Sequence, residues 1–158
     1  LRPRVVIVGI RNDIKTEFVY TKEHEVAPPT VGETLTELMG ANGWSGADSW
    51  AKGANKIAPT IVGGSKKHGG PDLGPVRARR AWAELGVDGN GVANDAPSAS
   101  FEGAPKLTKE MIALIQGFPP EWQFGKKKTS ACRMIGNAFP PPVACAVGKE
   151  IKRCLENA

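Results

Sequence analysis

Residues 5–10 restrict the possible folds of this 158-residue chain more than any other segment. Five of these six residues are β-branched, and the run is bounded by Pro3 and Arg11, which predicts a strand in the interior of a sheet. Residues 15–20 are expected to return as a second strand. A buried strand needs neighbours that pair its N–H and C=O groups, and the remaining sequence offers no other interior strand. The sheet should therefore be completed by another polypeptide or by a preceding part of this one.

Capping and termination signals predict five helices. Thr30 and Glu33 match the T-x-x-E capping box, which predicts a short helix to about residue 39. The other four are expected over residues 76–85, closed by Gly86; over 109–116, between Thr108 and Gly117; from Thr129 or Ser130 to Gly136; and after Pro142. The last helix carries an apolar stripe, Val143, Val147, Ile151 and Leu155, which must lie against an apolar surface.

Residues 41–74 are rich in glycine and keep no sustained period, which predicts a long irregular segment of the kind that carries function. The formal net charge of +5 is unevenly distributed. Seven Lys or Arg and one acid lie between Lys52 and Arg80, whereas residues 81–105 hold four acids and no Lys or Arg. A cationic block in a glycine-rich segment fits a phosphate-binding surface, and a solvated basic face is the alternative.

Cysteine usage and hydropathy exclude several classes of protein. Three cysteines without a CxxC spacing predict neither a disulfide framework nor a metal site. No apolar run of 18 residues is present and the start lacks the apolar core of a signal peptide, so we expect a protein of the cytoplasm without a membrane span. The chain begins without Met, and its first residue is expected to be a cut end.

Three segments resemble motifs of the cytosine-C5 DNA methyltransferases, in the family's order. Residues 1–11 are similar to motif VIII, which begins Gln-x-Arg-x-Arg and continues into an apolar strand. Leu107-Thr108 with residues 115–119 resembles motif IX, and residues 136–141 (Gly-Asn-Ala-Phe-Pro-Pro) resemble motif X. The chain departs from the pattern twice, because the opening Gln is absent and Pro105 stands where motif IX has an Arg.

The resemblance implies an α/β fold, as the C-terminal fragment of a Rossmann-like methyltransferase. Such a fragment would hold one or two sheet strands, a glycine-rich irregular recognition region and C-terminal helices. Residues 1–22 would be a strand segment of the catalytic domain and residues 23–103 the target recognition region. Residues 104–158 would carry motifs IX and X back to the catalytic domain.

The resemblance also implies the chemistry and what the chain lacks for it. In this family, which includes restriction–modification enzymes, a Cys thiolate from a Pro-Cys motif attacks a flipped cytosine, and S-adenosylmethionine provides the methyl group for C5. None of Cys132, Cys145 and Cys154 follows a proline, and no Glu-Asn-Val is present. The chain is therefore expected to be inactive without an N-terminal half or subunit that holds the catalytic Cys.

Motif positions select the candidate site residues. Arg4 matches the motif VIII arginine that reaches the cytosine O2, with Arg2 beside it. The alternative is that both arginines only flank the solvent-exposed end of a strand. Asn137 and Ala138 match motif X positions that approach the methionine part of the cofactor, although a plain turn is the alternative. Double-stranded DNA, in a prokaryotic nucleoid, is the expected partner. Residues 59–64 are similar to a Thr-Leu-containing segment that enters the DNA in the family, and the basic block lies around them. The residues expected near DNA are therefore Thr60, Ile61, Gly63, Gly64, Lys66, Lys67, Arg77 and Arg79.

Two other hypotheses stay open. The chain could be a sequence-specific DNA-binding module or subunit without catalysis of its own. It could also be a truncated chain whose N-terminal strand finds neighbours in a domain-swapped or otherwise non-native oligomer.

Overall fold

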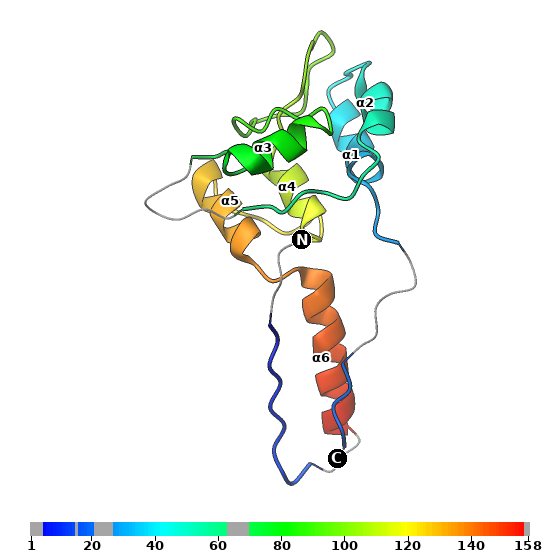
Figure 1. Ribbon diagram of the computed structural model, residues 1–158, viewed down its shortest axis with the longest axis vertical. Helices are drawn as coiled ribbons and strands as arrows, with labels where there is room; N and C mark the ends of the chain where they lie inside the picture. Colours follow the sequence, from blue (N-terminus) through cyan, green and yellow to red (C-terminus); the bar gives the residue numbers. More distant parts are fainter. Residues whose placement is uncertain (1–4, 15, 21–26, 63–69, 157–158) are drawn as a thin grey trace. The chain divides into compact units, whose positions relative to one another are not determined.

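The computed structural model describes residues 5–14, 16–20, 27–62 and 70–156, which fall into two units. The helical unit is Pro28–Ala138, and the terminal unit combines Leu1–Ala27 with Phe139–Ala158. The helical unit contains α1 (Val31–Gly40), α2 (Ala47–Gly53), α3 (Val76–Ala83), α4 (Lys109–Ile115) and α5 (Lys128–Asn137), which Figure 1 shows gathered around one another. The terminal unit contains α6 (Pro141–Glu156).

The predicted capping signals are confirmed in the helical unit. The Thr30 hydroxyl accepts a hydrogen bond from the backbone N–H of Glu33 (3.2 Å), and the Glu33 carboxylate accepts one from the backbone N–H of Thr30 (2.7 Å). Both bonds hold the pKa of Glu33 below its usual range. Thr108 caps α4 through the N–H of Met111 (3.3 Å). Gly86 and Gly117 have φ values of +67° and +89°, so each closes a helix in the left-handed conformation that glycine adopts without strain.

One hydrophobic core holds the helical unit together. α1 contacts both α2 and α4, and α4 contacts α5. Large, fully buried side chains come from positions spread along the whole unit: Leu35, Met39, Trp82, Leu107, Met111, Ile112 and Ile135. The β-type pairing among the described residues consists of isolated bridges, from Ser98 to residues 42 and 43 and from Ala93 to Thr108.

The short helix α2 was not predicted, because the region 41–74 was expected to be irregular throughout. Its N-cap, Gly46, makes no side-chain hydrogen bond, so the local sequence lacks a start signal. Tertiary packing stabilises α2 instead, because the Trp50 side chain is buried in the common core. α5 likewise begins at Lys128, ahead of the predicted caps Thr129 and Ser130, and the Lys128 side chain donates to the Val92 carbonyl (2.7 Å).

The predicted strand over residues 5–10 is wrong for this structure. Among the described residues no strand is assigned, including 16–20, and the side chains of Val5 and Ile7 are 88% and 90% exposed. The physical reason is that a strand exists only with neighbours to pair it, and the described residues provide no sheet. The Rossmann-like part of the predicted fold accordingly has no counterpart in the described residues.

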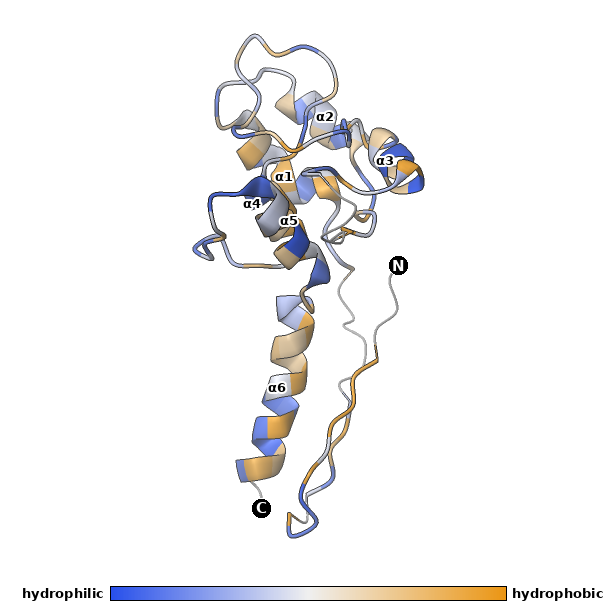
Figure 2. Cartoon of the chain, turned by 90° about the vertical axis from the view of Figure 1, so that its left-hand side faces the viewer, coloured by the Kyte–Doolittle hydropathy of each residue, from blue (hydrophilic) through white to orange (hydrophobic). Residues whose placement is uncertain are grey.

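The terminal unit joins α6 to the extended N-terminal segments through a few polar bonds. Arg153 donates to the Glu17 carbonyl (2.8 Å), and Glu150 accepts from the Val19 N–H (3.1 Å). The predicted apolar stripe of α6 is only partly covered, since Val143 and Leu155 are 46% and 55% exposed. Figure 2 shows hydrophobic colour along α6 and along the extended segments. No helix among the described residues is long and apolar enough to cross a membrane.

The approach of α1 to α2 yields a stability prediction. A Cβ on Gly32 would collide with the backbone carbonyl of Ala51, whereas a Cβ on Gly53 meets no heavy atom within 4 Å. We expect Gly32→Ala to lower the free energy of unfolding by at least about 2 kcal/mol through overpacking. The control Gly53→Ala should leave it unchanged or raise it by about 0.5 kcal/mol. Urea unfolding followed by circular dichroism measures both, and equal values for the two variants would contradict the proposed close packing.

Candidate functional site

The structure describes only part of the residues predicted to form the site. Arg2, Arg4, Gly63, Gly64, Lys66 and Lys67 lie outside the described residues. Thr60 is half-buried and Ile61 is buried in the core. Arg77 and Arg79 lie on α3, Asn137 is the last residue of α5, and Ala138 follows it. The described candidates therefore all belong to the helical unit.

Helix α3 presents a cationic surface. Arg77 and Arg80 are exposed, and neither guanidinium has a hydrogen-bond or ion-pair partner among the described residues. The helix follows Pro75, whose fixed φ favours a helix start, and it ends in the turn closed by Gly86. Two unpaired guanidinium groups on one short helix can each bind a phosphate oxygen.

Arg79 differs from its neighbours because it is tied into a hydrogen-bond network. Its guanidinium donates to the side-chain oxygen of Asn90 (2.8 Å). Asn90 in turn donates to Asp88 from its backbone N–H (2.9 Å) and its side-chain amide (2.7 Å). These bonds hold the pKa of Asp88 below its usual range, and Lys106 at 3.7 Å adds to the effect.

The network fixes the turn that faces α3. A Cβ on Gly89 would lie 3.1 Å from the Cγ of Arg79, so the backbone of this turn packs directly against the arginine stem. The N–H of Asp88 also donates to the carbonyl of Pro105 (2.9 Å). Sequence reasoning missed this arrangement, although Asp88-Gly89-Asn90 is a typical turn sequence.

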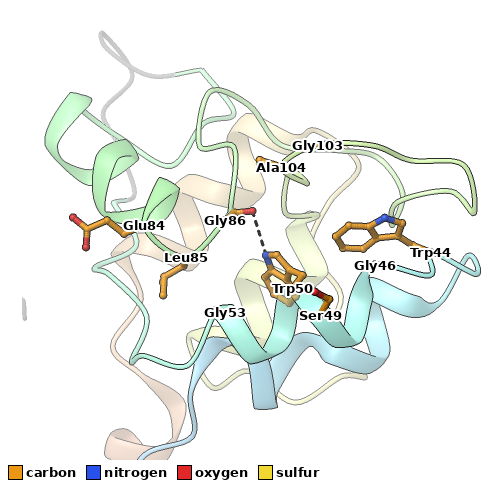
Figure 3. Close-up of a pocket in the computed structure, with 10 residues that line it drawn as sticks. All are labelled: Trp44, Gly46, Ser49, Trp50, Gly53, Glu84, Leu85, Gly86, Gly103 and Ala104. Atoms are coloured by element: carbon orange, nitrogen blue, oxygen red, sulfur yellow. Dashed lines mark hydrogen bonds between the residues drawn. The ribbon is translucent and has the colours of Figure 1, made fainter.

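A cavity of about 470 Å³ opens between α2, the turn after α3 and residues 103–104. Figure 3 shows Trp50 and Trp44 on its walls, with the Trp50 indole N–H donating to the Gly86 carbonyl (3.2 Å). The Trp44 indole donates to the Phe101 carbonyl (3.0 Å). The lining includes the carboxylate of Glu84 and no Lys or Arg, so it does not suit phosphate. The two indoles instead hold separate loops of the helical unit together.

The segment after α5 is the candidate cofactor side. The Asn137 side chain is exposed and has no partner among the described residues, so its amide is available to donate and accept. The backbone of Ala138 is already engaged, because its N–H bonds back into α5 and its carbonyl accepts from Gln116 (3.3 Å). These groups fit a polar ligand through Asn137 and a van der Waals contact through Ala138.

The cysteine of the helical unit, Cys132, is not an activated nucleophile. Burial raises the pKa of the Cys132 thiol, which favours the unreactive protonated form. Cys154 is buried and Cys145 is exposed, both on α6. No group of three or more His, Cys, Asp or Glu positioned for a metal ion occurs among the described residues.

Comparison with known proteins identifies relatives over the whole chain. The family model for C-5 cytosine-specific DNA methylase matches residues 1–153. The Type II methyltransferase M.NaeI of Lentzea aerocolonigenes is 60% identical over 158 residues, covering 98% of this chain and 38% of its own length. M.NgoMIV of Neisseria gonorrhoeae is 43% identical over 159 residues, covering 99% and 50%. DNA (cytosine-5)-methyltransferase 1 of Mus musculus matches 43 residues at 50% identity, 27% of this chain and 3% of its own.

No solved structure gives a significant match to this chain. The chain spans half or less of the length of the two Type II relatives.

The Asp88 network yields a pH-dependent stability prediction. Because the folded-state pKa of Asp88 is lowered, its carboxylate stabilises the fold above the unfolded pKa of about 3.9, and this contribution is lost as the pH falls through the folded value. We expect Asp88→Asn to lower the free energy of unfolding by about 1 kcal/mol near neutral pH. The difference from the unsubstituted protein should shrink in acid.

The matched control is Asp95→Asn, because Asp95 is exposed and has no partner among the described residues. Denaturant titrations at several pH values measure both variants. A loss for Asp88→Asn that is constant from neutral to acidic pH would contradict a charge-dependent role.

Proposed function

The chain belongs to the C-5 cytosine-specific DNA methylases, and from this premise we propose that it supplies the DNA-recognition and cofactor-side part of a DNA (cytosine-5-)-methyltransferase. The observation that carries the proposal is the family match, which runs through all three motif segments. The proposed reaction transfers a methyl group from S-adenosylmethionine to C5 of a flipped cytosine. The cytoplasm, where bacterial DNA lies, is its proposed compartment.

The proposed division follows the motifs: residues 1–22 join the catalytic domain, residues 23–103 recognise the target, and residues 104–158 return to the catalytic domain. The exposed Val5 and Ile7 support this division, because both side chains would be covered if the segment joined a sheet. The half-covered stripe of α6 supports it in the same way. We therefore propose that the catalytic Cys and the rest of the sheet come from an N-terminal half or subunit.

Arg4 is proposed to act on the cytosine ring, with Arg2 beside it. Attack by a thiolate at C6 builds negative charge on O2 and N3 of the ring, so a permanently charged guanidinium near O2 lowers the barrier most when the charge has developed. The raised pKa of Cys132 supports the proposal that the thiolate itself comes from elsewhere.

DNA is proposed to lie along the basic part of the recognition region. Arg77 and Arg80 are free to contact phosphates, together with Lys66 and Lys67, whereas Arg79 acts mainly by supporting the turn at Asp88. Thr60, Ile61, Gly63 and Gly64 are proposed to approach the DNA by their backbone, since the Ile61 side chain is committed to the core.

S-adenosylmethionine supplies the methyl group when it is bound. This chain would contribute Asn137, whose free amide can hydrogen-bond the polar end of the cofactor, and Ala138, whose small side chain permits close contact. Binding requires the N-terminal part as well.

Reconstitution tests the proposed function. We expect the purified chain to transfer no labelled methyl groups to DNA, because none of its cysteines follows a proline. Mixing it with the portion of M.NaeI that lies outside the match to this chain should restore transfer. Transfer by the chain alone would contradict the assignment of the nucleophile, and a mixture that binds DNA without transfer would favour a non-catalytic binding subunit.

Salt dependence tests the proposed phosphate contacts. We expect Arg77→Gln with Arg80→Gln to reduce the slope of log affinity against log salt for duplex DNA by about 1.8, since each phosphate contact contributes about 0.9. The control pair Lys149→Gln with Lys152→Gln removes two exposed cations from α6. Fluorescence anisotropy over a salt series measures both, and equal slopes for the two pairs would remove α3 from the DNA-binding surface.

A further inference from the structure

A second cavity of the helical unit, of about 630 Å³, lies between α1, α4 and the segment that follows α4. Its aromatic wall is formed by Phe118, Trp122 and Phe124, and Leu114 contributes an aliphatic side. Two acidic residues, Glu37 of α1 and Glu110 of α4, and one basic residue, Lys109 of α4, also line it. These residues are distinct from those proposed to bind DNA or cofactor.

The aromatic wall is held in a fixed arrangement. Phe118 contacts Phe124 edge-on at 5.0 Å between ring centroids and Trp122 at 5.6 Å. Phe118 is buried at 8% exposure and anchors the group, and the backbone N–H of Trp122 donates to the Pro119 carbonyl (3.0 Å). Trp122 nevertheless leaves 57% of its surface exposed. Its ring is thus positioned by its neighbours without being covered by them.

The charges around this cavity are predominantly negative. The Glu37 carboxylate has no hydrogen-bond or ion-pair partner among the described residues. The Lys109 ammonium lies 3.5 Å from the Glu110 carboxylate and donates to the carbonyls of Phe124 and Gly125 (3.4 and 3.5 Å), so its donors are engaged within the protein and Glu37 is left without a cation. Glu121, beside Trp122 in the sequence, adds another exposed carboxylate. DNA phosphate is therefore disfavoured here, and a cation is favoured.

We propose that this cavity binds an arginine side chain presented by a segment of a partner protein. A guanidinium can stack on the face of a tryptophan and donate to carboxylates at the same time, so it suits a cavity whose lining includes Trp122, Glu37 and Glu110. The cavity is also larger than one side chain requires, and the apolar surface of Phe118 and Leu114 suits aliphatic residues that flank the arginine. The proposed occupant is therefore a peptide segment in which aliphatic residues flank an arginine.

The test uses the whole chain and the peptide acetyl-Gly-Leu-Arg-Leu-Gly-amide. Its control carries citrulline in place of arginine, which keeps the shape and removes the charge. The NMR resonance of the Trp122 indole N–H, assigned with Trp122→Phe, reports binding at the cavity. We expect a saturable shift with the arginine peptide and affinity at least about tenfold weaker with citrulline, the cost of about one lost charged contact.

Variants of the protein complete the test. Glu37→Gln with Glu110→Gln should weaken the arginine peptide at least about tenfold, whereas the control pair Glu84→Gln with Glu102→Gln, exposed carboxylates elsewhere, should not. Unchanged circular dichroism and duplex DNA affinity would show that both pairs keep the fold. The proposal is overturned if citrulline binds as well as arginine, if the Glu37 and Glu110 pair leaves binding unchanged, or if the indole resonance of Trp122 does not move.

Discussion

The helical unit depends on the junction between the start of α1 and the end of α2. The first N–H groups of α1 are satisfied by carbonyls from the segment after α2, with Val31 bonded to Lys56 (3.0 Å) and Gly32 to Ala54 (2.8 Å). Only glycine at position 32 permits this approach, because any side chain would meet the backbone of Ala51. Since α1 also contacts α4, and α4 contacts α5, the placement of the remaining core follows from this junction.

Features encoded in a few neighbouring residues could be predicted from the sequence. The capping box of Thr30, the Thr108 cap and the closing glycines Gly86 and Gly117 act within one helical turn, so their sequence signals suffice. Features that depend on distant partners could not be predicted. α2 exists because Trp50 reaches the core, and residues 5–10 form no strand because no neighbouring strand pairs with them among the described residues.

The same distinction applies to the site. Motif order was enough to predict the family, which the comparisons confirm over residues 1–153. The roles of individual residues could not be predicted. Nothing in the local sequence reveals that the Arg79 guanidinium bonds to Asn90 while those of Arg77 and Arg80 have no partner among the described residues. Tertiary contacts thus divide three similar arginines of α3 into one that supports the fold and two that are available for a ligand.

The core of the helical unit is built from its own residues, from Val31 to Ile135. A segment that buries its apolar side chains internally can be replaced as a whole in evolution. The packing of the terminal unit does not depend on the side chains of that core. Recombination between related genes at positions near 27 and 139 would thus exchange a complete folding unit. The exchanged unit would carry the three arginines of α3 together with Asn137 and Ala138, so the residues of both proposed surfaces would be inherited as one piece.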